Sequence, residues 1–359
     1  METSESHDDV VVLEGGVIVP AMKKYTPPLK DRNGSELLQM NDLFRGRFRV
    51  RGLIGRGGYG QIYYASDPVF PDDVVIKIEP VIRRGSTSKR MLLEQKILYR
   101  LQGRPHVPIM CASGHTDQLN FIVMQLLGPN IGDLKKRSPV KRLSPSTVAR
   151  IIIQVRFKCS LEISDEGSQG IAALRDVHSL GYLHRDVKPA NMCFGITQNT
   201  RHVLKLVDYG LVRRFMDPDG TRRKPRSRPG FRGTLRYVSV RVHDRKEQCP
   251  ADDFVSMAYS GVELLLVNLP WKLSCIEDLR AAKEEFQQPN SPFLQLTGPI
   301  YTIFCAAVFS LRSTDEPDYS ALQALLFDMM EDKSMKDAYD WEENYRDAYG
   351  SSSTDYAEL

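Results

Sequence analysis

The stretch from His184 to Asn191, with the sequence HRDVKPAN, contains the residue types that phosphoryl transfer needs, and Asp208 follows it in an Asp-Tyr-Gly tripeptide. Asp186 can accept the proton of an attacking hydroxyl, and Lys188 can face the transferring phosphate. Asn191 and Asp208 offer the oxygen ligands that hold a magnesium ion between phosphates. Each piece alone is weak evidence, because such tripeptides are common in solvated loops, but their order along the chain makes the combination specific.

This arrangement is the catalytic-loop signature of protein kinases. Two predicted elements would position it. The apolar segment from Val203 to Val207 has the composition of a short strand that ends directly before Asp208. A stretch with helical periodicity ends near His178 and leads into the loop. We therefore expect the polar residues to be held between a helix and a strand.

A second group of residues, nearer the N-terminus, has the features of a nucleotide site. The sequence from Gly55 to Gly60 contains a GxGxxG pattern, which also occurs in dinucleotide-binding oxidoreductases. In those proteins a helix follows the glycines, whereas here Gln61 to Ala65 alternate like a strand. We therefore reject the oxidoreductase and expect a glycine-rich hairpin over the phosphates of ATP.

Lys77, at the end of the next predicted strand, fits the phosphate-binding lysine of the kinase pattern. Residues 89–102 have the pattern of an amphipathic helix, and Glu94 within it is the candidate ion-pair partner of Lys77. The strand from Phe121 to Gln125 runs into a loop that suits the hinge between two lobes, where the backbone would meet the adenine. The predicted ATP-binding residues are Gly55, Gly57, Gly58, Gly60, Ile62, Lys77, Glu94, Met124, Gln125 and Leu127.

Several longer strings resemble the casein kinase 1 superfamily, and within it the tau-tubulin kinase-like branch: LLEQKILYRLQG, FIVMQLLGPNIGDL, HSLGYLHRDVKPANM, GFRGTLRYVSVRVH and NLPW. The resemblance covers about residues 44 to 345. It implies an α+β, two-lobed protein kinase fold, with a β-rich N-lobe that has one main helix and a mainly α-helical C-lobe. It also implies ATP and Mg²⁺ as cofactors and serine or threonine acceptors in protein substrates, in agreement with Lys188.

The resemblance also implies roles for residues after the catalytic loop. Thr234 matches a threonine that contacts the catalytic aspartate and lysine, and Arg236 matches a phosphate-binding arginine. Asp253 matches the aspartate that braces the catalytic loop from a large helix. Ser239-Val240-Arg241 stands where most kinases have Ala-Pro-Glu. That departure is a trait of the family and does not argue against activity.

The segment from Asp208 to Arg236 is strongly basic: nine arginines and lysines against three aspartates give a local charge of +6, more than the +4 of the whole chain. Such a run is often only a solvated face. We favour a site for acidic or already phosphorylated protein segments, which bind arginine through charge-assisted hydrogen bonds. Nucleic acid is not expected, because no interleaved aromatic set accompanies the basic residues. The predicted substrate anion site consists of Arg228, Arg232 and Arg236.

One segment interrupts the resemblance. A helix is predicted to start at Ser144-Pro145 behind the catalytic loop, but residues 155–169 (VRFKCSLEISDEGSQ) are rich in charge and helix breakers. With these fifteen residues removed, Ile171 falls four positions after Ile152 and continues its apolar stripe; with them it lies about 100° off the stripe. A retained intron or gene-model artefact and a genuine surface insertion both remain open. A helix disrupted there would make the chain a pseudokinase that binds partners without transferring phosphate.

Length and composition fit this organisation. The chain of 359 residues is long enough for two lobes, and its 42% hydrophobic and 26% charged residues are typical of a soluble globular protein. Neither a signal-peptide pattern nor a membrane-spanning run is present, and the six cysteines lack metal-site spacing. We expect a cytoplasmic monomer without membrane contact, with nuclear entry left open. The predicted parts are a disordered extension (1–43), an N-lobe (44–127), a C-lobe (128–345, with the atypical insertion at 155–169) and a disordered tail (346–359).

Overall fold

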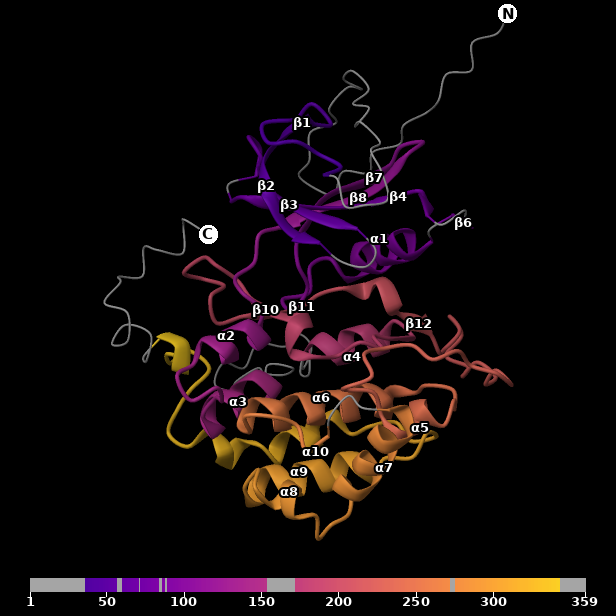
Figure 1. Cartoon of the computed structure of the whole chain (residues 1–359), viewed down its shortest axis with the longest axis vertical. Helices are drawn as coiled ribbons and strands as arrows, with labels where there is room; N and C mark the ends of the chain where they lie inside the picture. Colours follow the sequence, from indigo (N-terminus) through magenta and orange to yellow (C-terminus); the bar gives the residue numbers. More distant parts are fainter. Residues whose placement is uncertain are drawn as a thin grey trace, which may run out of the picture. The chain divides into compact units, whose positions relative to one another are not determined.

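The computed structural model describes residues 36–56, 60–70, 72–83, 86–87, 89–153, 172–271 and 275–342. These residues form two compact units (Figure 1). The first unit contains the chain up to Gly103 together with Val107–Leu127, and the second contains Arg104–His106 and the chain from Gly128 onward. The predicted insertion, the predicted tail, and Gly57 and Gly58 of the glycine-rich stretch lie outside the described residues.

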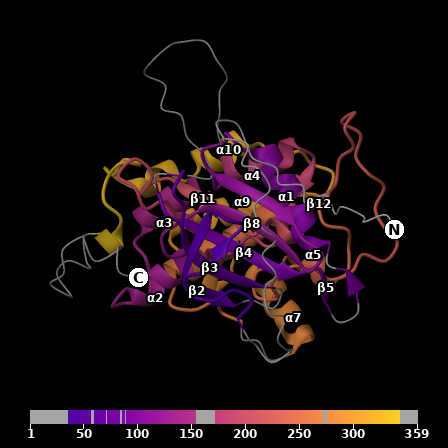
Figure 2. The ribbon, with the colours of Figure 1, turned by 90° about the horizontal axis from the view of Figure 1, so that it is seen from above.

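The first unit is built on a six-stranded antiparallel sheet in the order β1-β2-β3-β4-β8-β7, and Figures 1 and 2 show its middle strands side by side. Alternating side chains of its strands point into an apolar core, in which the rings of Phe44 and Phe121 meet edge to face at 5.1 Å. Gln95 of the helix α1 donates hydrogen bonds to two carbonyls of the sheet. The elements are β1 (Leu43–Phe44), β2 (Phe48–Arg56), β3 (Gln61–Ser66), β4 (Val74–Pro80), β5 (Ile82–Arg83), β6 (Ser86–Thr87), α1 (Arg90–Leu101), β7 (Met110–His115) and β8 (Leu119–Gln125).

The first unit includes residues that the prediction assigns to the extension over residues 1–43. Leu37 and Leu38 are buried, and both backbone amides donate to the hydroxyl of Tyr63 on β3, at 2.8 and 3.1 Å. Two adjacent leucines contribute apolar area to the core, and the tyrosine satisfies the amides that are buried with them. The residues from Glu36 to Asp42 therefore belong to the first unit.

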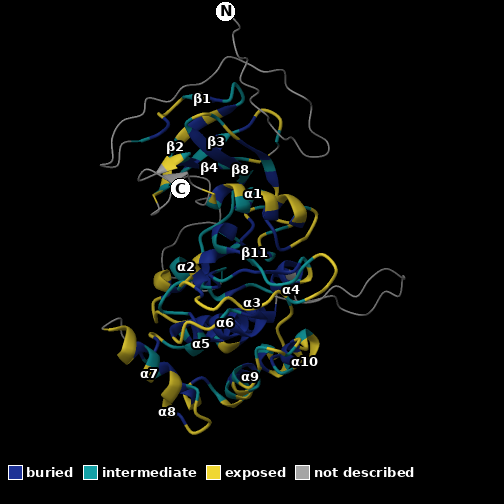
Figure 3. Ribbon diagram, turned by 90° about the vertical axis from the view of Figure 1, so that its right-hand side faces the viewer, coloured by how far each residue is buried: buried dark blue, intermediate teal, exposed yellow. Residues whose placement is uncertain are grey.

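The second unit is mainly helical. The helix α6 lies at its centre, where every residue of the helix except Glu263 is buried (Figure 3). A Cβ at Gly261 would clash with the hydroxyl of Tyr301, so glycine at this position lets α9 approach α6 closely. The helices are α2 (Ile131–Arg137), α3 (Pro145–Ile153), α4 (Ala172–Ser179), α5 (Val240–His243), α6 (Pro250–Leu265), α7 (Ile276–Phe286), α8 (Pro292–Gln295), α9 (Pro299–Phe309) and α10 (Tyr319–Ala324).

Short strands and 3₁₀ turns of the second unit carry the residues that the sequence singles out. They form two small antiparallel pairs, β10 with β11 and β12 with β9. Residues 319–330 form α10 followed by a 3₁₀ turn. These elements are β9 (Tyr182–Leu183), η1 (Pro189–Asn191), β10 (Met192–Phe194), β11 (Leu204–Leu206), η2 (Tyr209–Leu211), β12 (Arg213–Arg214) and η3 (Phe327–Met330).

Helices α3 and α4 come before and after residues 154–171, which lie outside the described part of the chain. Helix α3 begins as predicted, and the hydroxyl of Ser144 accepts a hydrogen bond from the amide of Thr147 at 3.2 Å. Ile152 of α3 and Leu174 and Val177 of α4 are all buried. The predicted apolar stripe is thus in the core on both sides of the segment 155–169, and both hypotheses about that segment stay open.

The longest described helix, α6, has 16 residues. In the part of the chain that the structure describes, no helix combines the length and the apolar character that crossing a bilayer requires.

Candidate active site

Asp186, Lys188 and Thr234 form a triangle of contacts in the second unit. The Nζ of Lys188 donates to Oδ2 of Asp186 at 2.7 Å and lies 2.9 Å from Oγ1 of Thr234, whose hydroxyl donates to Oδ1 of Asp186 at 2.6 Å. The carboxylate is buried and the ammonium is partly exposed. The fold therefore places a proton acceptor beside a fixed cation, the two groups that the sequence predicts to act together.

Asp253 on α6 holds the backbone of the catalytic loop. Its carboxylate accepts hydrogen bonds from the amides of His184 and Arg185, both at 2.8 Å. Burial raises the pKa of Asp253, but hydrogen bonds from His178 and the amide of Arg185 outweigh it, so the pKa lies below its usual value. Arg185 has a φ of 68°, which residues other than glycine rarely adopt. The two amide contacts stabilise this strained turn directly before Asp186.

The support behind Asp253 includes two residues that the sequence analysis missed. His178 lies in the last turn of α4, with Nε2 2.9 Å from the Asp253 carboxylate and Nδ1 2.8 Å from the hydroxyl of Tyr319. Histidine is favoured in the last turn of a helix because of the helix dipole, so the position of His178 in the sequence does not by itself indicate a supporting role. Tyr319 is 141 residues further along the chain, so no spacing connects it with the loop.

The hairpin of β10 and β11 brings Asn191 and Asp208 to the same end of two paired strands. Met192 pairs with Leu206, and the amide of Val207 donates to the carbonyl of Asn191 at 3.0 Å. The side-chain amide of Asn191 donates to the carbonyl of Asp186 at 2.8 Å, which orients its Oδ1. Amide and carboxylate oxygens are the ligands that hard divalent cations prefer, so this donor set fits such a metal.

In the first unit, Lys77 and Glu94 form the ion pair that the sequence predicts. The Nζ of Lys77 on β4 lies 2.8 Å from each carboxylate oxygen of Glu94 on α1. The Glu94 side chain is 3% exposed and that of Lys77 is 21% exposed. The pair fixes the direction of the lysine, whose side chain remains partly exposed.

Two of the predicted glycines, Gly55 and Gly60, fall within the described residues and lie on either side of the connection between β2 and β3. Gly55 pairs with Ile62, and Ile62 pairs with Lys77 on the neighbouring strand. A Cβ at Gly60 would clash with the backbone carbonyl of Ile78, so the close approach of the strands requires glycine. The register therefore places Ile62 between the glycine-rich hairpin and the lysine.

The predicted adenine-binding residues lie at the end of β8. Met124 is half-buried and pairs with Val75 of β4. The side chain of Gln125 points back into the unit, where its Oε1 accepts a hydrogen bond from the amide of Ile109 at 2.8 Å. Leu127 is half-buried and is the last residue of the first unit. The side-chain oxygen and the backbone amide of Gln125 are therefore both engaged with Ile109 inside the first unit.

Comparison with known proteins decides the family. A model of the protein kinase domain matches residues 48–335. The chain belongs to the protein kinase family. A putative casein kinase I of Caenorhabditis elegans is 38% identical over 349 residues, which cover 96% of this chain and 98% of that protein. A probable serine/threonine-protein kinase of Dictyostelium discoideum is 33% identical (84% of this chain, 57% of that protein), and a putative serine/threonine-protein kinase of C. elegans is 32% identical (86% of each).

These similarities confirm the two-lobed α+β kinase fold and the resemblance to casein kinase 1. They also support a serine/threonine kinase, because the relatives named above are kinases of that class. Kinases of this family use ATP and a divalent metal and act on protein substrates. The placement in the tau-tubulin kinase-like branch stays a prediction.

Some arginines of the kinase's activation segment, which runs from Asp208 to Arg236, are already paired. Glu247, in the loop after α5, lies 2.8 Å from Nε of Arg213 and 2.7 Å from Nε of Arg226. Burial raises the pKa of Glu247, but the hydrogen bonds from Arg226 and the charge of Arg213 outweigh it and lower the pKa to about 2. Burial and the charges of the same two arginines lower the pKa of Arg185 to about 10. This part of the kinase is thus rich in positive charge and has one carboxylate between two arginines.

The predicted substrate arginines differ in their surroundings. Arg228 and Arg232 are exposed, and Nη1 of Arg232 donates to the carbonyl of Phe231 at 2.8 Å. Arg236 is half-buried and its Nη2 lies 2.9 Å from Oε1 of Glu263. The sequence did not indicate this pairing, because Glu263 belongs to another element and lies 27 residues away.

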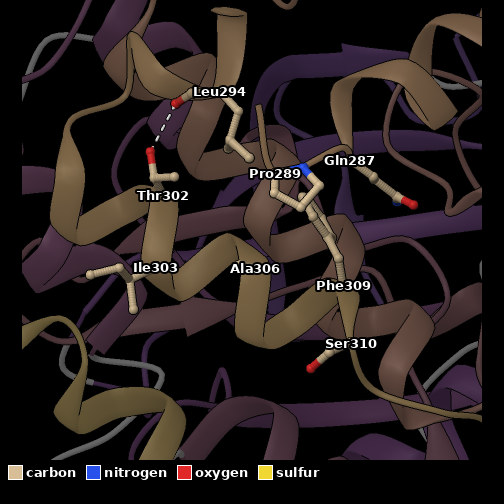
Figure 4. A pocket seen from close by; sticks show the side chains of 8 residues that line it. All are labelled: Gln287, Pro289, Leu294, Thr302, Ile303, Ala306, Phe309 and Ser310. Carbon is tan, nitrogen blue, oxygen red and sulfur yellow. Dashed lines mark hydrogen bonds between the residues drawn. The ribbon is translucent and has the colours of Figure 1, made fainter. Parts of the chain in front are cut away.

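A surface pocket of the kinase lies between α8 and α9 (Figure 4). The hydroxyl of Thr302 donates to the carbonyl of Leu294 at its edge, at 3.1 Å. None of the lining residues is a carboxylate, an amine, an imidazole or a thiol, so the pocket lacks the groups that phosphoryl transfer needs. The lining residues are Gln287, Pro289, Leu294, Thr302, Ile303, Ala306, Phe309 and Ser310.

Proposed function

We propose that this kinase transfers the γ-phosphate of ATP to serine and threonine residues of protein substrates. The observation that carries the proposal is the contact triangle of Asp186, Lys188 and Thr234. Asp186 would accept the proton of the substrate hydroxyl as the oxygen attacks phosphorus. Lys188 would stabilise negative charge on the transferring group, and Thr234 would orient the carboxylate through its Oδ1.

We propose magnesium as the metal. Mg²⁺ bound with ATP neutralises charge on the phosphates and leaves the γ-phosphorus open to attack. Asn191 and Asp208 would bind this ion through their side-chain oxygens. Lys77, directed by Glu94, would position the phosphates of the nucleotide. The other residues proposed to bind ATP are Gly55, Gly57, Gly58, Gly60, Ile62, Met124, Gln125 and Leu127.

We propose that the substrates are acidic or pre-phosphorylated protein segments. Exposed basic residues crowd the activation segment, including Arg223, Lys224, Arg228 and Arg232. A surface of one sign attracts ligands of the opposite sign and speeds their association. Proteins are proposed rather than nucleic acid, because stacking residues do not alternate with the basic ones. A monomer in the cytoplasm, with nuclear entry left open, completes the proposal.

The runner-up is a pseudokinase, and it depends on the segment 155–169. A disrupted helix behind the loop would disturb the register of the residues that follow it. The described residues on both sides argue for an intact scaffold, because Ile152 and Leu174 are buried and Asp253 braces the loop. The predicted catalytic set, with Asp186, Lys188, Asn191 and Asp208, is also complete.

The test is phosphate transfer from labelled ATP to casein and to an acidic peptide. Three proteins are compared: the natural chain, Asp186→Asn, and a version that lacks residues 155–169. Transfer by the natural chain that Asp186→Asn abolishes would support the enzyme and show that the segment is tolerated. Transfer by the shortened version alone would show that the segment disables the chain, and no transfer by any of the three would favour the pseudokinase.

A further inference from the structure

Glu263 is the one residue of α6 that is not buried, and its carboxylate is fully engaged by the activation segment. Its Oε1 accepts hydrogen bonds from Nε and Nη2 of Arg236, at 3.1 and 2.9 Å. Its Oε2 accepts a hydrogen bond from the hydroxyl of Tyr237. The side chains of Arg236 and Glu263 are only 24% and 16% exposed, so water screens the pair weakly.

The backbone on both sides of Arg236 is held in place. The indole Nε1 of Trp271 donates to the carbonyl of Arg236 at 3.0 Å. The Nζ of Lys283, a fully buried residue of α7, donates to the carbonyls of Leu235 and Val238 at 2.7 and 2.6 Å. These contacts fix the backbone from which the Arg236 side chain leaves. The pair with Glu263 is therefore pre-organised, and forming it costs little further ordering.

The position of Arg236 gives this pairing a consequence for substrates. Arg236 follows two residues after Thr234, so it is close in sequence to a residue whose hydroxyl contacts the catalytic carboxylate of Asp186. A phosphate on the substrate could use Arg236 only by displacing Glu263, which is tethered in the same protein at a high effective concentration. Displacement would also leave a mostly buried carboxylate without its cation, which is costly.

We propose that Glu263 is a specificity-determining residue, which occupies Arg236 in place of a substrate phosphate. The kinase then recognises acidic residues through the exposed part of its basic segment, and a phosphate near the acceptor is not required. This inference rests on the proposed function and narrows its substrate class from acidic or pre-phosphorylated segments to acidic ones. Glu263 acts through Arg236 and takes no part in the transfer itself.

The test measures KM and kcat for two peptides that differ only in one residue near the acceptor, phosphoserine in one and aspartate in the other. The natural chain should use both about equally. Glu263→Gln keeps the shape and frees the guanidinium, so KM for the phosphoserine peptide should fall by about tenfold, as expected for one new charge-assisted contact. KM for the aspartate peptide and kcat should change little.

Two variants control this measurement. The double variant Glu263→Gln/Arg236→Gln should lose the gain for the phosphoserine peptide, because the freed cation is absent. Glu284→Gln makes the same charge change on an exposed residue of α7 that pairs with Arg280, and it should leave both peptides unaffected. A gain that survives in the double variant, or that appears equally in Glu284→Gln, would overturn the inference.

The natural chain also provides a test that does not depend on a folded variant. Phosphoserine and aspartate are placed in turn at each position around the acceptor. Equal use at every position supports the occupied Arg236, and a strong preference for phosphoserine at any position overturns it. If the natural chain transfers phosphate to no peptide, the proposed function itself fails. If it transfers phosphate but Glu263→Gln has no effect on KM, only the inference about Glu263 fails.

Discussion

The catalytic loop and the activation segment both carry charged residues that the sequence singles out, but the charges find their partners at different distances along the chain. In the loop, Asp186 meets Lys188 two residues away and Asn191 five residues away. In the segment, three arginines have carboxylate partners that lie 21 to 34 residues away. The spacing of residues in the sequence therefore predicts which groups of the loop act together. In the segment, the fold decides which arginines are left to bind a substrate. The long-range pairs are Arg213–Glu247, Arg226–Glu247 and Arg236–Glu263.

The largest expected effect lies in the loop, where no distant residue can replace the proton acceptor. Asp186→Asn keeps the hydrogen bonds of the triangle in part but removes the base, so phosphate transfer should fall by about 10² to 10⁴. Steady-state kcat measures the loss, and the melting temperature should stay nearly constant. Asp328→Asn, the same change at an exposed aspartate, should keep full activity. Residual activity close to that of the natural chain would refute the role of Asp186.

The second effect tests whether the catalytic loop keeps its conformation without the hydrogen bonds that it donates to Asp253. Asp253→Asn replaces one oxygen of a fully engaged carboxylate with an NH₂ group, which would face one of the two backbone donors. Unfolding in urea should show a loss of about 2 to 4 kcal/mol, because buried donors lose their acceptor. Transfer should fall as well, since Arg185 would no longer be held in its strained turn. An unchanged unfolding free energy would show that the loop needs no support from α6, and Asp332→Asn is the exposed control.

The same difference between short-range and long-range contacts decides which features of the structure the sequence predicts. The strand β3 follows from the alternation of residues 61–65, and the ion pair of Lys77 with Glu94 follows from the kinase pattern. The pairing of Arg236 with Glu263 does not, because it depends on how α6 packs beneath the activation segment. The burial of Leu37 was also missed, since two leucines in a polar stretch carry no period of their own.

The third effect concerns pH and the hairpin that carries Asp208. His106 is buried with Nδ1 2.8 Å from the carbonyl of Leu204 on β11, and burial lowers its pKa from 6.5 to about 4. Between these two values the unfolded chain binds a proton that the folded chain does not, so stability falls as pH drops below 6.5. From about pH 7.5 to about pH 5.5 this loss should reach about 1 kcal/mol.

The histidine's contribution is isolated by comparing the pH dependence of unfolding with that of His106→Gln. The variant cannot titrate at this position, so its unfolding free energy should fall less over the same pH range. Other buried groups, such as His243, whose pKa burial lowers to about 4, contribute equally to both proteins. Parallel pH profiles for the two proteins would contradict the assignment.

The smallest effect on stability, and the sharpest test of the comparison, is expected at Glu247. Glu247→Gln removes the charge that ties Arg213 to Arg226, and because the pair is partly exposed the unfolding free energy should fall by less than about 1 kcal/mol. Hydrogen exchange of residues 213–226 should nevertheless increase, since a link over 34 residues has no local substitute. Glu284→Gln breaks an exposed pair with Arg280, four residues away, and should leave that exchange unchanged. Equal exchange in both variants would mean that the segment keeps its conformation without Glu247. The contrast between long-range pairing in the segment and short-range pairing in the loop would then have no consequence for the segment's conformation.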